Sequence, residues 1–200
     1  TKALLRVDKL TSDNLKYTAG QVTFPIKFYT KVSLKLKKEG GFNISERSSR
    51  KSVIEHVFLL MKKAIGFKDG FFIDVEEDSE IIHGGLGSTG SIFGGVATAI
   101  NEIYGNPIKE DQLLKYLSQN YGEEIENSKD LLNPVQSVGG SIAGGLYSGG
   151  ILIISGENRV VKTGRVSEEY DIILGYPKNF KRIPSNMAFD KEKDNFSKFK

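Results

Sequence analysis

The sequence predicts a two-layer α+β domain in which a mixed β-sheet is covered by helices. Residues 21–38 alternate apolar and polar side chains with the period of a strand. Two other stretches, 48–65 and 90–104, instead repeat apolar residues every three or four positions, which is the period of an amphipathic helix. These stretches do not alternate strictly along the chain, so the pattern favours an α+β layered domain.

The first predicted elements are a strand and a helix. In the strand, residues 21–38, one face carries Val32, Leu34 and Leu36, and the Gly40-Gly41 pair ends it as a turn. The helix from Ser48 to Ile65 ends at Gly66, a typical helix stop. Its apolar face is formed by Val53, Val57, Leu60, Met61 and Ala64.

The middle of the chain predicts a strand, a glycine-rich loop and two helices. The strand is "GFFIDVEE", residues 70–77, and the helix after the loop runs from Gly90 to Tyr104. That helix has one apolar face and ends before Gly105-Asn106-Pro107, because proline cannot continue it. A further helix is predicted over residues 109–120.

The last part of the chain predicts an irregular segment, three strands and a tail. Residues 133–150 are rich in glycine and serine and are expected to be irregular. Strands are expected at 151–154, 160–163 and 171–175. The lysine-rich residues 178–200 are expected to be a polar tail or the start of a further domain, so the predicted domain covers residues 1–177.

The composition excludes several classes of site. The chain has 200 residues, enough for one domain with a sizeable core, and a mild net charge of +3 that gives no indication of nucleic-acid binding. Without cysteine it has no disulfide, thiolate metal site or cysteine nucleophile, and with two histidines a structural zinc site is not expected. No apolar run reaches membrane-spanning length, and no signal peptide is recognisable. We therefore expect a cytoplasmic protein that binds neither membrane nor nucleic acid.

The most informative segment is "SEIIHGGLGSTGSIFGG", residues 79–95, because four glycines lie between residues 84 and 90. Glycine lets a ligand approach the backbone closely, and a following helix N-terminus offers unpaired N–H groups to an anion. The pattern therefore predicts a phosphate site. Two alternatives remain open, a glycine-rich turn without a ligand and the dinucleotide fingerprint G-x-G-x-x-G, which Gly85, Gly87 and Gly90 fit. A Walker A loop is excluded because no lysine precedes Ser88 or Thr89.

"GGLGSTGS" resembles the second motif of the GHMP small-molecule kinases, G-L-G-S-S-A at the start of a helix. Thr89 and Gly90 stand in place of the second serine and the alanine. Weaker likeness extends over "KYTAGQVTFPI", "GGILIISGENRVV" and "YDIILGYP". The resemblance implies the fold of the GHMP N-terminal domain, with ATP and Mg²⁺ as cofactors. It implies phosphate binding by Gly84, Gly85, Leu86, Gly87, Ser88, Thr89, Gly90 and Ser91, and magnesium binding by Ser88 and Glu124.

The sequence departs from that family at two motifs. The first family motif is represented only by Arg6, Val7 and Asp8. The catalytic aspartate that many members carry before a Gly-Gly pair is missing, since its position falls on Val138, Ala143 or a neighbour. The catalytic base is therefore unassigned. The loss is tolerable because phosphoryl transfer depends mostly on positioning and charge stabilisation.

The expected function is an ATP-dependent kinase that acts on a hydroxyl of a small-molecule substrate. One alternative is a transferase that uses phosphoribosyl pyrophosphate, similar to the β-ribofuranosylaminobenzene 5′-phosphate synthases, in which a histidine also precedes the loop, as His83 does here. Another is a degenerate kinase-like module that only binds ligands or dimerises; a homodimer is also compatible with the kinase.

The expected role of Gly87 leads to a test of the phosphate site. If the loop is exposed and phosphate oxygens approach Gly87, then Gly87→Val should abolish nucleotide binding and leave the fold nearly as stable. If Gly87 only permits a tight turn, the same change should destabilise the domain by about 1 kcal/mol or more.

Overall fold

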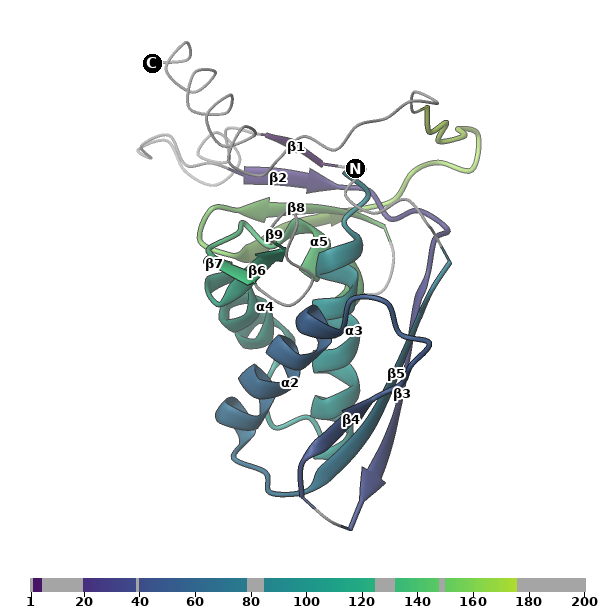
Figure 1. The fold of residues 1–200 in the computed structure, drawn as a ribbon. Coiled ribbons are helices and arrows are strands. Elements are labelled where there is room, and N and C mark those ends of the chain that lie inside the picture. Colours follow the sequence, from purple (N-terminus) through teal and green to yellow (C-terminus); the bar gives the residue numbers. More distant parts are fainter. Residues whose placement is uncertain are drawn as a thin grey trace.

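The computed structural model describes residues 2–4, 20–38, 40–78, 85–124, 132–147 and 150–175. The order of the elements follows the chain (Figure 1). They are β1 (Lys2–Leu4), β2 (Gly20–Thr23), β3 (Thr30–Lys37), β4 (Phe42–Ile44), α2 (Lys51–Ile65), β5 (Gly70–Glu77), α3 (Ser88–Ile103), α4 (Glu110–Gln119), β6 (Tyr121–Glu124), β7 (Leu132–Val135), α5 (Gly140–Leu146), β8 (Ile151–Ser155) and β9 (Arg159–Gly164).

The strands form three sheets, and the helices cover them (Figure 1). One sheet has the order β1-β2-β8-β9 with antiparallel pairs throughout. The second has the order β3-β5-β4, in which β3 is antiparallel and β4 parallel to β5. The third is the β6-β7 hairpin. The predicted α+β class with a mixed, helix-covered sheet is confirmed.

The core lies where α2 and α3 pack against the β3-β5-β4 sheet and against each other. The apolar face of α2 that the sequence predicts is buried over Val53, Val57 and Met61. The helix ends as expected at Gly66, which adopts φ +80° and donates its N–H to the Lys62 carbonyl at 2.8 Å. Helix α3 contributes Ile92, Phe93, Val96 and Ile100 to the same core.

Three predictions about the strands and the irregular segment are wrong. The predicted strand 21–38 is two strands in different sheets, β2 and β3, with Pro25 between them, because proline lacks the N–H that a continuous ladder needs. The glycine-rich stretch 133–150 includes most of β7 and the whole of α5. Residues 171–175 form no strand, and Ile173 is 90% exposed, because no strand in the described part of the chain pairs with this apolar run.

The dinucleotide alternative does not fit this topology. That fold needs a strand after the glycine-loop helix, parallel to the strand before the loop. Here α3 is followed by α4, and the partners of β5 are β3 and β4, both of which precede it in the chain. The glycine loop is therefore not the first crossover of a doubly wound parallel sheet.

Some sequence predictions fall outside the described residues. These are the first-motif remnant at Arg6, Val7 and Asp8, the loop residues His83 and Gly84, the proposed domain boundary at 177 and the tail 178–200. In the part of the chain that the structure describes, no helix is long and apolar enough to cross a membrane.

Candidate functional site

The glycine loop leads directly into α3. Gly85 and Gly87 have φ angles of +75° and +82°, which favour glycine, and Gly87 is the N-cap residue of the helix. No side chain caps this helix end. The bond from the Ser91 N–H to the Gly87 carbonyl, 3.0 Å, is that of the first helical turn. The N–H groups of Ser88, Thr89 and Gly90 precede it, so they have no partner within the helix and suit an anion.

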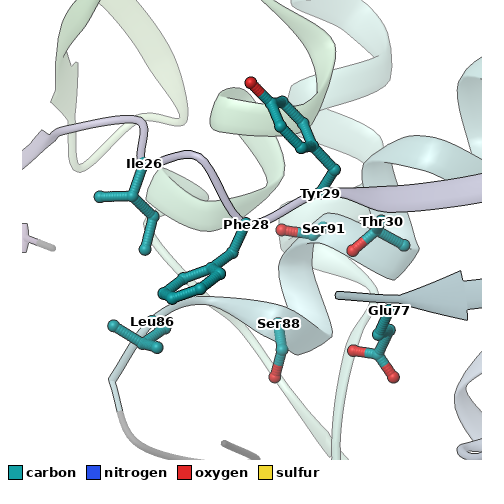
Figure 2. Close-up of a pocket in the computed structure, with 8 residues that line it drawn as sticks. All are labelled: Ile26, Phe28, Tyr29, Thr30, Glu77, Leu86, Ser88 and Ser91. Atoms are coloured by element: carbon teal, nitrogen blue, oxygen red, sulfur yellow. The ribbon is translucent and has the colours of Figure 1, made fainter. Parts of the chain in front are cut away.

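A small pocket open to solvent lies beside this helix end (Figure 2). Ile26, Phe28 and Leu86 gather at one end of it, whereas Thr30, Glu77, Ser88 and Ser91 lie at the other (Figure 2). Tyr29 completes the lining. The pocket therefore has an apolar end and a polar end, and the polar end lies at the first turn of α3.

Arg50 joins the elements around the loop. It is the residue just before α2, and its side chain is only 4% exposed. Its Nε donates to both carboxylate oxygens of Glu124 at 3.0 Å, and its Nη2 donates to Glu124 Oε2 at 2.5 Å. Its Nη1 donates to Ser88 Oγ at 2.9 Å, and Nη2 also donates to the Thr89 hydroxyl. Glu77 Oε1 lies 3.7 Å from Nη1. One buried guanidinium thus holds together α2, the end of β5, the start of α3 and the end of β6.

The two predicted magnesium ligands, Ser88 and Glu124, do lie near each other, but Arg50 lies between them. Magnesium requires oxygen ligands at about 2.0–2.1 Å in octahedral geometry. The same Ser88 and Glu124 oxygens accept hydrogen bonds from the guanidinium, which is itself a cation. In this arrangement the pair does not fit a magnesium ion. Among the described residues, no group of three or more His, Cys, Asp or Glu side chains could hold a metal ion.

Tyr121 links the first turn of α3 to α5. Its side chain is buried, and burial raises the pKa of its hydroxyl, as does the negative charge of Glu123. Hydrogen bonds with Thr89 and Ser141 act on this pKa in the opposite direction, but burial prevails. The phenol therefore stays protonated at neutral pH.

Two loop glycines are required by the packing of α5 against α3. A Cβ atom on Gly90 would lie 2.7 Å from the backbone carbonyl carbon of Ser141, and one on Gly87 would lie 2.8 Å from Ser141 Cβ. Distances below 3.0 Å force a neighbour to move. The expectation that Gly87→Val leaves the fold nearly as stable is therefore wrong, because valine would meet both this contact and a positive φ.

Val138 and Ala143, the positions that correspond to the family aspartate, lie just before α5 and within it. The pairs Gly139-Gly140 and Gly144-Gly145 stand at the start and near the end of this helix. Ser141, between them, faces the glycine loop, and no residue of α5 carries a carboxylate. The carboxylate that lines the pocket is Glu77.

Sequence reasoning predicted Ser88, Leu86 and Ser91 at this site but missed Arg50, Glu77, Tyr121 and Ser141. Arg50 stands in a polar run of arginines and serines with no motif of its own. Its partner Glu124 lies 74 positions further along the chain. No sequence spacing could have indicated this contact.

Comparisons with known proteins bear on the same region. Residues 52–140 match the model of the GHMP kinases N terminal domain, a little under half of the chain. A comparison with curated proteins found no match.

Three solved structures are similar to this chain. A homoserine kinase from Cytophaga hutchinsonii ATCC 33406 is 22% identical with a TM-score of 0.41, over 50% of this chain and 34% of that one. The Methanococcus jannaschii mevalonate kinase is 16% identical with a TM-score of 0.48, over 80% and 53% of the two chains. Another mevalonate kinase is 16% identical with a TM-score of 0.47, over 84% and 55%. The chain thus spans between 34% and 55% of the length of these structures.

The matched segment begins in α2, contains the glycine loop and α3, and ends at the first residue of α5. It includes Glu77, Ser88 and Glu124 of the site, whereas Arg50, Ser141 and the pocket residues before α2 lie outside it. Residues 52–140 of this chain are therefore similar to the N-terminal domain of the GHMP kinases.

Proposed function

We propose that this chain binds the phosphates of ATP at the N-terminus of α3 and acts as a small-molecule kinase that transfers the terminal phosphoryl group to a hydroxyl of a small metabolite. The observation that carries the proposal is the two-ended pocket beside the glycine loop, whose Glu77, Leu86, Ser88 and Ser91 lie in the segment that matches the GHMP kinase model. The acceptor is not assigned. Homoserine, mevalonate, pantoate and sugars all remain compatible.

The pocket, at about 30 Å³, does not enclose a nucleotide, so in this proposal its polar end binds phosphate oxygens and its apolar end is a surface for the base. Phosphate oxygens at the polar end accept hydrogen bonds from the first N–H groups of α3 and from the hydroxyl of Ser88, whereas the Ser91 hydroxyl donates to the Gly87 carbonyl at 3.2 Å. The dipole of α3 adds about half a positive charge at the same place. The base ring packs against Phe28 and Leu86 at the apolar end, where aromatic and aliphatic side chains favour a flat ring.

The chemical contribution of these residues is to position the phosphoryl group. Phosphoryl transfer passes through a loose transition state in which little covalent work is left to the protein. Ser88 and the backbone N–H groups at the start of α3 hold the transferred group in place and stabilise its negative charge. No described residue is assigned as the base, and no step of the proposal uses a metal ion held by Ser88 and Glu124.

Two other functions remain as outcomes of the test. A phosphoribosyl pyrophosphate-dependent transferase would use the same loop for a pyrophosphate group. The absence of a carboxylate on α5 favours the second alternative, a kinase-like module that binds a ligand without catalysis. The cytoplasmic location, the homodimer and the domain boundary at 177 stay predictions, of which the homodimer is the simplest to check, by light scattering.

A substitution at Ser91 separates phosphate binding from folding. Ser91→Asp places a carboxylate in the first turn of α3, which has no acidic residue. The helix dipole stabilises a negative charge at this position, so the carboxylate favours the folded state, but it repels a bound phosphate. We expect ATP affinity to fall by about tenfold or more, which corresponds to at least about 1.4 kcal/mol, with the midpoint of thermal unfolding unchanged or raised. The matched neutral variant, Ser91→Asn, should keep most of the affinity.

Calorimetric titration of the wild type with ATP, adenosine, phosphoribosyl pyrophosphate and NAD tests the function itself. Binding of ATP but not of adenosine, followed by ADP release with one acceptor of the panel, supports the kinase. Binding of phosphoribosyl pyrophosphate in preference to ATP supports the transferase. ATP binding that is equal in Ser91→Asp and Ser91→Asn would show that the phosphates do not lie at this helix end.

A further inference from the structure

Arg50 stands where the sequence predicts a magnesium ion. Glu124 and Ser88, the predicted ligands, both accept hydrogen bonds from its guanidinium at 3.0 and 2.9 Å. Arginine has a flat, always charged head group whose donors match a carboxylate in fork geometry. The guanidinium can therefore link a serine hydroxyl to a glutamate in the way a bound cation would.

The negative charges of two largely buried carboxylates, Glu77 and Glu124, lie close to the positive charge of Arg50. Glu124 and Glu77 are 17% and 12% exposed, and both approach the guanidinium, at 2.5 Å and 3.7 Å. A buried guanidinium needs such partners because an unpaired buried charge is costly. A divalent ion bound to the same Ser88 and Glu124 oxygens would lie beside the guanidinium and be repelled by it.

The hydrogen bond from Arg50 also changes what the Ser88 hydroxyl can do. As a metal ligand, this oxygen would direct a lone pair at the cation. Here the lone pair accepts from Nη1, so the hydroxyl hydrogen is left to donate to another acceptor. Ser88 lines the polar end of the pocket, where the acceptor would be a phosphate oxygen.

We infer that Arg50 replaces a protein-held metal ion at the glycine loop and sets the Ser88 hydroxyl as a hydrogen-bond donor to the phosphate of the ligand. The inference deepens the proposed function and rests on it for the identity of the ligand. Its consequence is that the protein adds no metal bridge between Ser88, Glu124 and the bound nucleotide.

The test is a thermodynamic cycle with two changes, the addition of Mg²⁺ and the substitution Glu124→Gln. ATP affinity is measured calorimetrically at equal ionic strength with Mg²⁺ and with EDTA, in the wild type and in Glu124→Gln. We expect Mg²⁺ to change the wild-type affinity by less than about threefold, and Glu124→Gln to leave that ratio as it is. A Mg²⁺ advantage of about tenfold or more that disappears in Glu124→Gln would overturn the inference.

Arg50→Met provides the converse arm, because methionine keeps a long apolar stem but removes the charge. In this variant the Ser88 and Glu124 oxygens lose the guanidinium, and we expect Mg²⁺ to tighten ATP binding by about tenfold. Arg47→Met is the matched control, since Arg47 is 71% exposed and pairs with Asp74. Arg47→Met should show the same ratio of ATP affinities with Mg²⁺ and with EDTA as the wild type. If Arg50→Met does not fold, the wild-type and Glu124→Gln cycle still decides the question.

Failure of the proposed function is recognised separately. A wild type that binds no ATP with or without Mg²⁺ contradicts the nucleotide site, and Mn²⁺ alone then tests Arg50 by electron paramagnetic resonance. Under the inference the wild type holds no Mn²⁺ at Ser88 and Glu124. A bound Mn²⁺ that is lost in Glu124→Gln would overturn it, whatever the ligand is.

Discussion

Gly90→Ala is expected to be among the most destabilising single changes in this domain, at about 3 kcal/mol, although alanine is the better helix former. The added Cβ would lie 2.7 Å from the backbone carbonyl carbon of Ser141 in α5, which cannot turn away as a flexible side chain can. Relief requires α5 to move from α3, and this contact is part of the most extensive helix–helix packing in the described structure. The measurement is the free energy of unfolding from urea titration.

A matched glycine in the neighbouring helix provides the control. The Cβ of an alanine at Gly144 would lie 3.7 Å from Thr23 Cγ2, an ordinary van der Waals distance, and the position is exposed. Gly144→Ala should therefore stabilise the domain by up to about 1 kcal/mol. If Gly90→Ala is as stable as the wild type, α5 can shift away from α3. The close packing of α3 against α5 would then not explain why position 90 is a glycine.

Arg50→Ala is expected to destabilise the domain by about 3–5 kcal/mol, because it removes a buried guanidinium that contacts the largely buried carboxylates of Glu77 and Glu124. The loss should be visible as a lower urea midpoint at neutral pH. Adding Glu124→Gln removes the charge of one of the two carboxylates that Arg50 contacts, so the double variant should recover part of the lost free energy.

Arg47 shows how much of this effect comes from burial. Arg47 pairs with Asp74 at 2.5 Å, but its side chain is 71% exposed, so Arg47→Ala should cost about 1 kcal/mol or less. Equal losses of unfolding free energy in Arg47→Ala and Arg50→Ala would show that burial adds nothing to the contacts of Arg50 with Glu77 and Glu124.

Elements with strong local periodicity were predicted closely. The helix expected over 48–65 is Lys51–Ile65, the one over 90–104 is Ser88–Ile103, and the one over 109–120 is Glu110–Gln119. Each has a continuous apolar face, and the ends of the first two are marked by glycine. Helix α5 was missed because five of its seven positions are glycine, alanine or serine, in a run whose composition is typical of a loop. Its helical form depends on contacts with α3 rather than on its own propensity.

The segment 171–175 shows the opposite error. "DIILG" has the apolar, β-branched composition of a strand, but a strand is stabilised only by a neighbour that completes its hydrogen bonds. No such neighbour is described for it, and its side chains are exposed. The composition of residues 171–175 predicted a strand, but the tertiary structure provides no described partner strand for them.

The sequence by itself determined the α+β class, the loop of glycines before α3 and the family likeness, because these depend on residues that are adjacent in the chain. Only the tertiary structure decided what surrounds that loop. It brings Arg50, Glu77 and Glu124 together around Ser88, and it places Ser141 against Gly87 and Gly90. The physical reason is that a backbone conformation is encoded locally, whereas the choice of cation at the loop and the need for glycine depend on segments that meet only when the chain folds.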